Sequence, residues 1–314
     1  MPMTKTLLGV ATGAALGGTA VWVRRKVKAV ERANSPAGRF VTVDGVRLHY
    51  IDVGQGPTLV LLHGLGSMVE DFMLSGLVRE ASEHYRVIAF DRPGYGHSER
   101  PRRWRYGAFA QADLISKALR TLDVHRPIVL GHSWGTLVAA ALALEHPGTV
   151  RGLVLVSGLY FPSLRLDTPL LIPPAIPLVG DVLRHTLSPL AGRALWPAWL
   201  KMIFAPAPVP ASFEPFPEWM ALRPSQLYAV AEDAWLTAPA TFRLSRRYRD
   251  LKLPVVLVGG ERDRYVNPRA HTRRLGKMLP ARRVMMSPDS GHMVHHSDLP
   301  LVLDAIDTAA APAA

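Results

Sequence analysis

The segment PIVLGHSWGTLVAAALALEH, residues 127–146, decides the fold. Its first part is apolar and bounded by Pro and Gly, which predicts a buried strand over residues 127–131. The last part is rich in Ala and Leu and stops before Pro147, which predicts a helix over residues 134–146. The connection between them, Gly131-His132-Ser133-Trp134-Gly135, matches the pattern G-x-S-x-G. In this strand, turn and helix context, the pattern lifts a serine hydroxyl above a sheet, and small flanking residues permit the sharp turn.

Strand-like and helix-like segments alternate on both sides of this motif. Asp44-Gly45 between the first two strands is typical of a hairpin turn. The expected strands are Arg39–Val43, Val46–Val53, Thr58–Leu62, 85–90, 127–131, 150–156, 255–259 and 283–286, and the expected helices are 106–122, 134–146, 268–279 and one from Asp298. Short strands separated by helices predict an α/β fold, in which helices cover both faces of a mostly parallel sheet.

The alternation stops between residues 159 and 251. This stretch is rich in proline and carries four tryptophans, Trp196, Trp199, Trp219 and Trp235. Because strands return after it, we expect a lid inserted into a single domain. The expected organisation is an N-terminal helix and basic linker (1–38), the first part of the core (39–158), the lid (159–251) and the second part of the core (252–314).

The composition restricts the classes of function. The 314 residues are 48% hydrophobic and 20% charged, as in a globular protein. There is no cysteine, which excludes disulfides, thiolate metal sites and a cysteine nucleophile. The formal net charge of +12 predicts a basic surface. No nucleic-acid-binding motif accompanies this charge, so we expect no nucleic-acid partner.

Residues 7–23 form an uncharged segment, LLGVATGAALGGTAVWV, that is barely long enough to cross a bilayer. Lys5 precedes it, and the cationic residues Arg24, Arg25, Lys26, Lys28 and Arg32 follow it. This bias predicts a single membrane anchor with the main domain on the cytoplasmic side. A signal peptide cleaved before Val21, followed by export, is the alternative, and a peripheral helix is a third possibility.

A serine hydroxyl is a weak nucleophile and needs a base that is oriented by an acid. In sheets that carry this motif the chain order is serine, acid, histidine. His292, in Ser290-Gly291-His292, follows the last expected strand and is the candidate base. Asp263 follows strand 255–259 and is the candidate acid, with Glu261 in reserve. We therefore predict a catalytic triad of Ser133, Asp263 and His292.

The negative charge that forms during such a reaction needs backbone donors. The N–H of Trp134, directly after the serine, is one candidate, and that of Leu65, in His63-Gly64-Leu65-Gly66, is the other. His292, His295 and His296 have a spacing that would also suit a metal site on one helical face. The Glu of a zinc-protease motif is absent. We expect no metal and no cofactor.

From Arg39 to the C-terminus the sequence resembles the α/β-hydrolase superfamily, in the branch with a lid before the strand that bears the acid. The matching segments are His63-Gly64-Leu65-Gly66, Asp91-Arg92-Pro93-Gly94-Tyr95-Gly96-His97-Ser98, Gly131-His132-Ser133-Trp134-Gly135, Asp263 and Ser290-Gly291-His292. Haloalkane dehalogenases and epoxide hydrolases of this branch are similar but carry Asp where this chain has Ser133. The resemblance therefore implies an acyl-enzyme on Ser133.

The apolar and aromatic lid indicates a small apolar substrate, and a carboxylic ester or thioester is the leading class. A carbon–carbon bond hydrolase or an amidase with the same triad is the alternative within enzymes. A non-catalytic binding protein on this fold is the alternative outside them.

Overall fold

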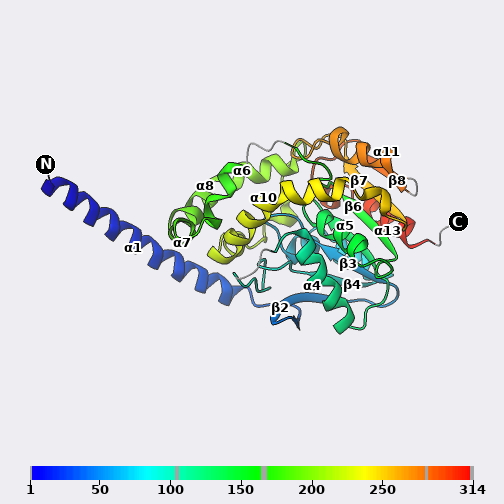
Figure 1. Ribbon diagram of the computed structural model, residues 1–314, viewed down its shortest axis with the longest axis horizontal. Helices are drawn as coiled ribbons and strands as arrows, with labels where there is room; N and C mark the ends of the chain where they lie inside the picture. The colour runs from blue at the N-terminus through cyan, green and yellow to red at the C-terminus, as the bar shows by residue number, and fades with distance from the viewer. Residues whose placement is uncertain (1, 103–105, 164–167, 280–281, 312–314) are drawn as a thin grey trace.

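The structure is a computed structural model that describes residues 2–102, 106–163, 168–279 and 282–311. Figure 1 shows a body of helices around a sheet, from which the N-terminal helix projects. The described strands are β1 (Arg39–Val43), β2 (Val46–Val53), β3 (Thr58–Leu62), β4 (Arg86–Phe90), β5 (Ile128–His132), β6 (Gly152–Val156), β7 (Val255–Gly260) and β8 (Arg282–Ser287). They confirm the expected strands, with boundaries that differ by at most two residues.

These strands form one sheet in the order β1-β2-β4-β3-β5-β6-β7-β8. The β1–β2 and β2–β4 pairs are antiparallel, and every later pair is parallel. Asp44 and Gly45 have φ of 49° and 75°, the positive values that a tight hairpin turn requires. The parallel strands end at one edge of the sheet, where α/β proteins place their sites.

Helices cover both faces of the sheet, as expected. One face packs against α4 (Ala108–Thr121), α5 (Gly135–Glu145) and α11 (Arg274–Met278), and the other against α2 (Val69–Leu74), α3 (Leu77–Ala81) and α13 (Leu299–Ala310). In β3, Val60 and Leu62 belong to the first core and Leu59 and Leu61 to the second. Successive side chains of a strand point to opposite faces, which is why the buried strands are apolar throughout. The short α2 and α3 were not expected.

The chain between β6 and β7 forms the lid. These strands are neighbours in the sheet, so the lid interrupts the core instead of following it. Its elements are α6 (Thr168–Leu171), η1 (Pro173–Ala175), α7 (Val179–His185), α8 (Leu187–Phe204), η2 (Ala211–Phe213), α9 (Glu218–Ala221), α10 (Pro224–Ser245) and η3 (Tyr248–Asp250). Figure 1 shows α6, α7, α8 and α10 on the side of the body from which α1 extends.

Helix α1 (Pro2–Ala33) is longer than the segment expected to be helical. Its C-terminal part lies against the lid, where Trp22 meets Trp219 edge to face at 5.5 Å and Glu31 pairs with Arg223 at 3.1 Å. Within the described residues, no helix combines the length and the hydropathy that a membrane span needs. The expected span over residues 7–23 is therefore not supported.

Candidate active site

Ser133 lies at the turn between β5 and α5, on the edge where the parallel strands end. Its φ of 52° is unusual for a residue with a side chain, and its N–H is held by the Val156 carbonyl at 2.8 Å. A Cβ on Gly135 would lie 2.1 Å from the Leu62 carbonyl oxygen. Glycine is thus required there for α5 to approach β3. This is the elbow that the motif predicts, with the start of α5 beneath the hydroxyl.

The structure brings the three predicted triad residues together. Nε2 of His292 lies 2.9 Å from Oγ of Ser133, and Nδ1 of His292 lies 2.8 Å from Oδ2 of Asp263. All three side chains are buried, with residue exposures of 4%, 3% and 7% for Ser133, His292 and Asp263. A continuous chain of hydrogen bonds therefore runs from a hydroxyl to a carboxylate across three separate loops.

Backbone groups fix the carboxylate of Asp263. Its Oδ1 accepts hydrogen bonds from the N–H groups of Tyr265 and Val266, both at 2.8 Å, which leaves Oδ2 to face His292. The reserve acid, Glu261, instead pairs with Arg273 on the exposed side of the loop. The geometry thus selects Asp263 over Glu261 as the partner of His292.

The loop with the predicted oxyanion donor Leu65 comes close to the serine. A Cβ on Gly64 would lie 3.1 Å from Cβ of Ser133, so only glycine fits without displacement. Neither the N–H of Leu65 nor that of Trp134 donates a hydrogen bond to another group in the described part of the chain. Both donors are therefore available to a negatively charged oxygen beside Ser133.

Arg92 holds this loop in place, a role that could not be predicted from the sequence. Its backbone N–H donates to Nε2 of His63 at 3.0 Å, and its guanidinium donates to the carbonyl oxygen of Gly64 at 2.9 Å. The same guanidinium pairs with Asp233 of lid helix α10 at 2.8 Å, and both side chains are fully buried. Burial, followed by the charge of Arg92, lowers the pKa of His63 to about 4. Arg92 thus links the oxyanion loop, at Gly64, to the lid, at Asp233.

Two small apolar cavities meet at Ser133. One, of about 30 Å³, is lined by Trp199, Ile203, Phe213, Phe216 and Met293, together with Asp71, His132 and His292. The other, of about 20 Å³, is lined by Leu159, Thr168, Leu171, Ala234 and Thr237. Leu65, Ser133 and Tyr265 border both cavities. This arrangement offers separate spaces for the two sides of a bond that is cleaved at the serine.

The three histidines near the C-terminus do not form the common metal site that their spacing allowed. His292 faces Ser133 and Asp263, whereas Nε2 of His295 and Nε2 of His296 both contact Oδ1 of Asp71, at 3.2 and 2.8 Å. Burial opposes ionisation of Asp71, but His295 and His296 outweigh it and hold the pKa of this carboxyl well below its ordinary value.

Comparison with known proteins fits this geometry. Residues 57–299, more than half of the chain, match the family model described as alpha/beta hydrolase fold. The chain belongs to this family. A relative that spans most of this alpha/beta hydrolase is the uncharacterized protein Rv2715 of Mycobacterium tuberculosis, which is 26% identical over 302 residues, 90% of this chain and 84% of that protein.

This alpha/beta hydrolase is also similar to two further proteins. The 2-hydroxymuconate semialdehyde hydrolase of a Pseudomonas species is 38% identical over 133 residues, 41% of this chain and 47% of that protein. A solved structure described as a membrane phospholipase A and bacterial virulence factor has a TM-score of 0.67 at 24% identity, and the match covers 97% of each chain. At that identity the likeness shows the shared fold. With its family established, the chain is a hydrolase.

Proposed function

We propose that the protein cleaves a carboxylic ester or thioester of an apolar acyl group through an acyl-enzyme on Ser133. One observation carries the proposal. The hydrogen-bonded chain Ser133, His292 and Asp263 opens directly onto two apolar cavities. Such a chain activates a hydroxyl toward a carbonyl carbon, and the apolar walls favour hydrocarbon groups on either side of that carbon.

The first half of the reaction forms the acyl-enzyme. Oγ of Ser133 attacks the carbonyl carbon while Nε2 of His292 accepts the hydroxyl proton. Asp263 stabilises the imidazolium through Nδ1 and keeps the ring in the required tautomer. The N–H groups of Leu65 and Trp134 donate to the oxyanion of the tetrahedral intermediate. When that intermediate collapses, His292 returns the proton to the departing alkoxide or thiolate.

The second half releases the acid. Water enters the space left by the alcohol or thiol, and His292 removes its proton as the oxygen attacks the acyl carbon. The new tetrahedral intermediate uses the same two backbone donors. Its collapse breaks the bond to Oγ, and the proton on His292 restores the hydroxyl of Ser133.

The walls of the cavities favour an ester over the substrate of a carbon–carbon bond hydrolase. The names of the related 2-hydroxymuconate semialdehyde and 2-hydroxy-6-oxo-2,4-heptadienoate hydrolases imply substrates that carry a carboxylate. Among the described residues that line the two cavities there is no Lys or Arg, and the acidic Asp71 is present. A carboxylate would therefore enter without a cationic partner, which costs several kcal/mol. A neutral ester meets no such penalty.

Steady-state turnover of four substrates tests this assignment. The purified full chain should hydrolyse p-nitrophenyl butanoate, and octanoate more slowly, because the closed lid leaves little space for a long acyl chain. Both 2-hydroxymuconate semialdehyde and butyryl p-nitroanilide should be turned over at least about 100-fold more slowly than the butanoate. Ser133→Ala should lower ester turnover by about 10³-fold or more with an unchanged circular dichroism spectrum. Faster cleavage of the semialdehyde or the anilide would replace the ester assignment. Absence of all turnover would favour a binding protein.

We also propose that helix α1 holds the protein at the cytoplasmic face of a membrane. The helix extends away from the body, as Figure 1 shows, and Arg24, Arg25, Lys26 and Lys28 are exposed along it. Anionic lipid headgroups attract such a cluster by about 1 kcal/mol per charge. Export after cleavage before Val21 is the alternative.

Membrane fractionation of the expressed chain tests the placement. The full chain should sediment with membranes, and the variant Arg24→Gln/Arg25→Gln/Lys28→Gln should remain in the supernatant, because it lacks three of the exposed cations. Trp22 is left in place, because it contacts Trp219 of the lid. Recovery of the full chain in the supernatant, or outside the cell without residues 1–20, would contradict the proposal.

A further inference from the structure

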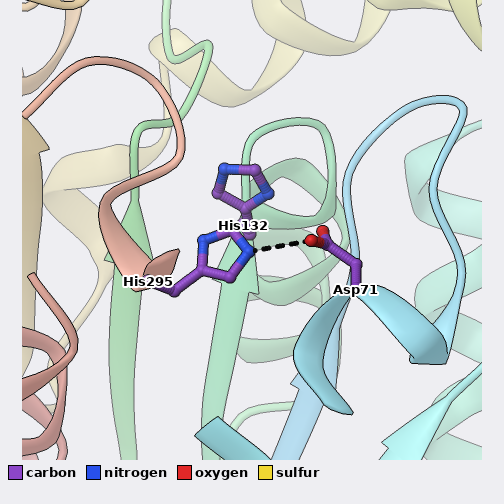
Figure 2. A group of neighbouring side chains, drawn as sticks. All are labelled: Asp71, His132 and His295. Atoms are coloured by element: carbon purple, nitrogen blue, oxygen red, sulfur yellow. Dashed lines mark hydrogen bonds and ion pairs between the residues drawn. The ribbon is translucent and has the colours of Figure 1, made fainter. Parts of the chain in front are cut away.

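A second group of polar side chains lies buried beside the triad, and the proposed reaction does not use it. Asp71 of α2, His132 at the end of β5 and His295 of α12 (Val294–Ser297) come together from three elements (Figure 2). Their exposures are 1%, 3% and 1%. One ligand atom of each lies within 4.8 Å of the corresponding atoms of the other two.

The hydrogen bonds of His132 leave one ring nitrogen ready to bind an ion. Its Nε2 donates to the carbonyl oxygen of His292 at 3.2 Å, so the proton lies on Nε2 and Nδ1 keeps a lone pair. This Nδ1 is buried without a hydrogen-bond partner among the described residues. Figure 2 shows it, next to the ring's attachment point, on the side of Asp71 and of Nε2 of His295. A histidine that binds a metal commonly donates its other N–H to a backbone carbonyl in this way.

The other two ligands are also oriented for one ion. Nε2 of His295 lies 3.2 Å from Oδ1 of Asp71, and Oδ2 of Asp71 accepts a hydrogen bond from Ser67 at 3.0 Å. Ligand atoms at about 2.0–2.2 Å from a tetrahedral zinc ion are about 3.3 Å apart. The pair therefore already has the required spacing. Only His132 needs to approach further.

From this geometry we propose that Asp71, His132 and His295 form a site for a divalent transition-metal ion, with Zn²⁺ as the best match. Two imidazole nitrogens and one carboxylate oxygen are a donor set that Zn²⁺ accepts, with water as the fourth ligand. His295 binds through Nε2 after its proton moves to Nδ1, which is unpartnered. His296 continues to donate to Oδ1 of Asp71 and orients it. Asp71 and His132 also line the cavity at Ser133.

Calorimetric titration of the metal-free full chain with ZnCl₂ tests the site. We expect one Zn²⁺ per chain with a micromolar or lower dissociation constant. His295→Gln and Asp71→Asn should each weaken binding by at least 100-fold. The matched control is His125→Gln, because His125 is 81% exposed, pairs with Asp123 and lies outside the group. It should bind like the unaltered chain.

X-ray absorption at the zinc edge extends the test to the unaltered chain, so that a variant that fails to fold does not decide the matter. The zinc-loaded protein should show nitrogen and oxygen ligands at about 2.0–2.1 Å, with the outer-shell pattern of two imidazoles. Binding of less than about 0.2 equivalents, equal binding by folded His295→Gln, or a spectrum without imidazole would overturn the proposal.

Discussion

Ser133 shows how much of the candidate site depends on the backbone of a single residue. Its positive φ is disfavoured for a residue with a Cβ, and it persists because β5, α5 and the Val156 carbonyl hold both sides of the turn. The hydroxyl is thereby placed in hydrogen-bond contact with His292 before any substrate binds. Such preorganisation means that a bound carbonyl meets an aligned nucleophile.

His63 leads to a prediction about acid stability. Its pKa falls from 6.5 to about 4 because it is buried and faces Arg92. Between these values the unfolded chain binds more protons, so stability increases with pH from about 4 to 6.5 and is lost as the pH falls again. The full difference corresponds to about 3 kcal/mol. In His63→Gln, urea unfolding from pH 4 to 6.5 should show a shallower rise, although this variant is less stable throughout.

His125→Gln is the control for this measurement, because His125 is exposed and its replacement should leave the pH dependence unchanged. Other titrating groups contribute equally to the three proteins and cancel in the comparison. An identical slope for His63→Gln and the unaltered chain would show that His63 titrates normally.

At the scale of elements, α8 limits the volume of the larger cavity beside Ser133, which the proposed function assigns to the acyl group. Trp199 and Ile203 of this helix cover Ser133 together with Phe213 and Phe216, and the enclosed volume is only about 30 Å³. A long acyl chain therefore cannot enter unless the lid moves or a side chain is shortened. Under the proposed function we therefore expect α8 to limit the length of the acyl chain.

Trp199→Ala should shift the preference toward longer esters. Each buried methylene contributes about 0.8 kcal/mol once space exists for it. The ratio of kcat/KM for octanoate to that for butanoate should increase at least about fivefold. Trp235→Ala is the matched control, because Trp235 is a lid tryptophan that is 60% exposed and does not line the cavity. An unchanged ratio in Trp199→Ala would place the acyl chain elsewhere.

At the scale of the whole molecule, the site residues that could be predicted from the sequence are those that the topology of a parallel sheet brings together. Ser133 and His292 are 159 residues apart, yet both follow parallel strands, and such strand ends meet at one edge. The link between Arg92 and Asp233, 141 residues apart, could not be predicted, because the packing of α10 on the core decides it. The group of Asp71, His132 and His295 could not be predicted either, because the sequence of α2 shows no clear helical periodicity. The histidine spacing offered His292, His295 and His296 as ligands of one metal, and of these only His295 belongs to the group.

The N-terminal segment illustrates a different limit. Charge bias and length predicted an anchor, whereas no helix among the described residues qualifies as a membrane span. Contacts of Trp22 and Glu31 with the lid then show that part of α1 belongs to the folded body. These contacts could not be predicted from the sequence pattern, because they depend on how the helix packs on the lid.

The central claim is that Ser133 is a nucleophile activated by His292. Mass spectrometry of the full chain after treatment with a fluorophosphonate measures this most directly. We expect one adduct per chain on the peptide that contains Ser133, none on that peptide in Ser133→Ala, and labelling at least about 10³-fold slower in His292→Gln. An adduct on another residue, or equal labelling rates with and without His292, would contradict the account.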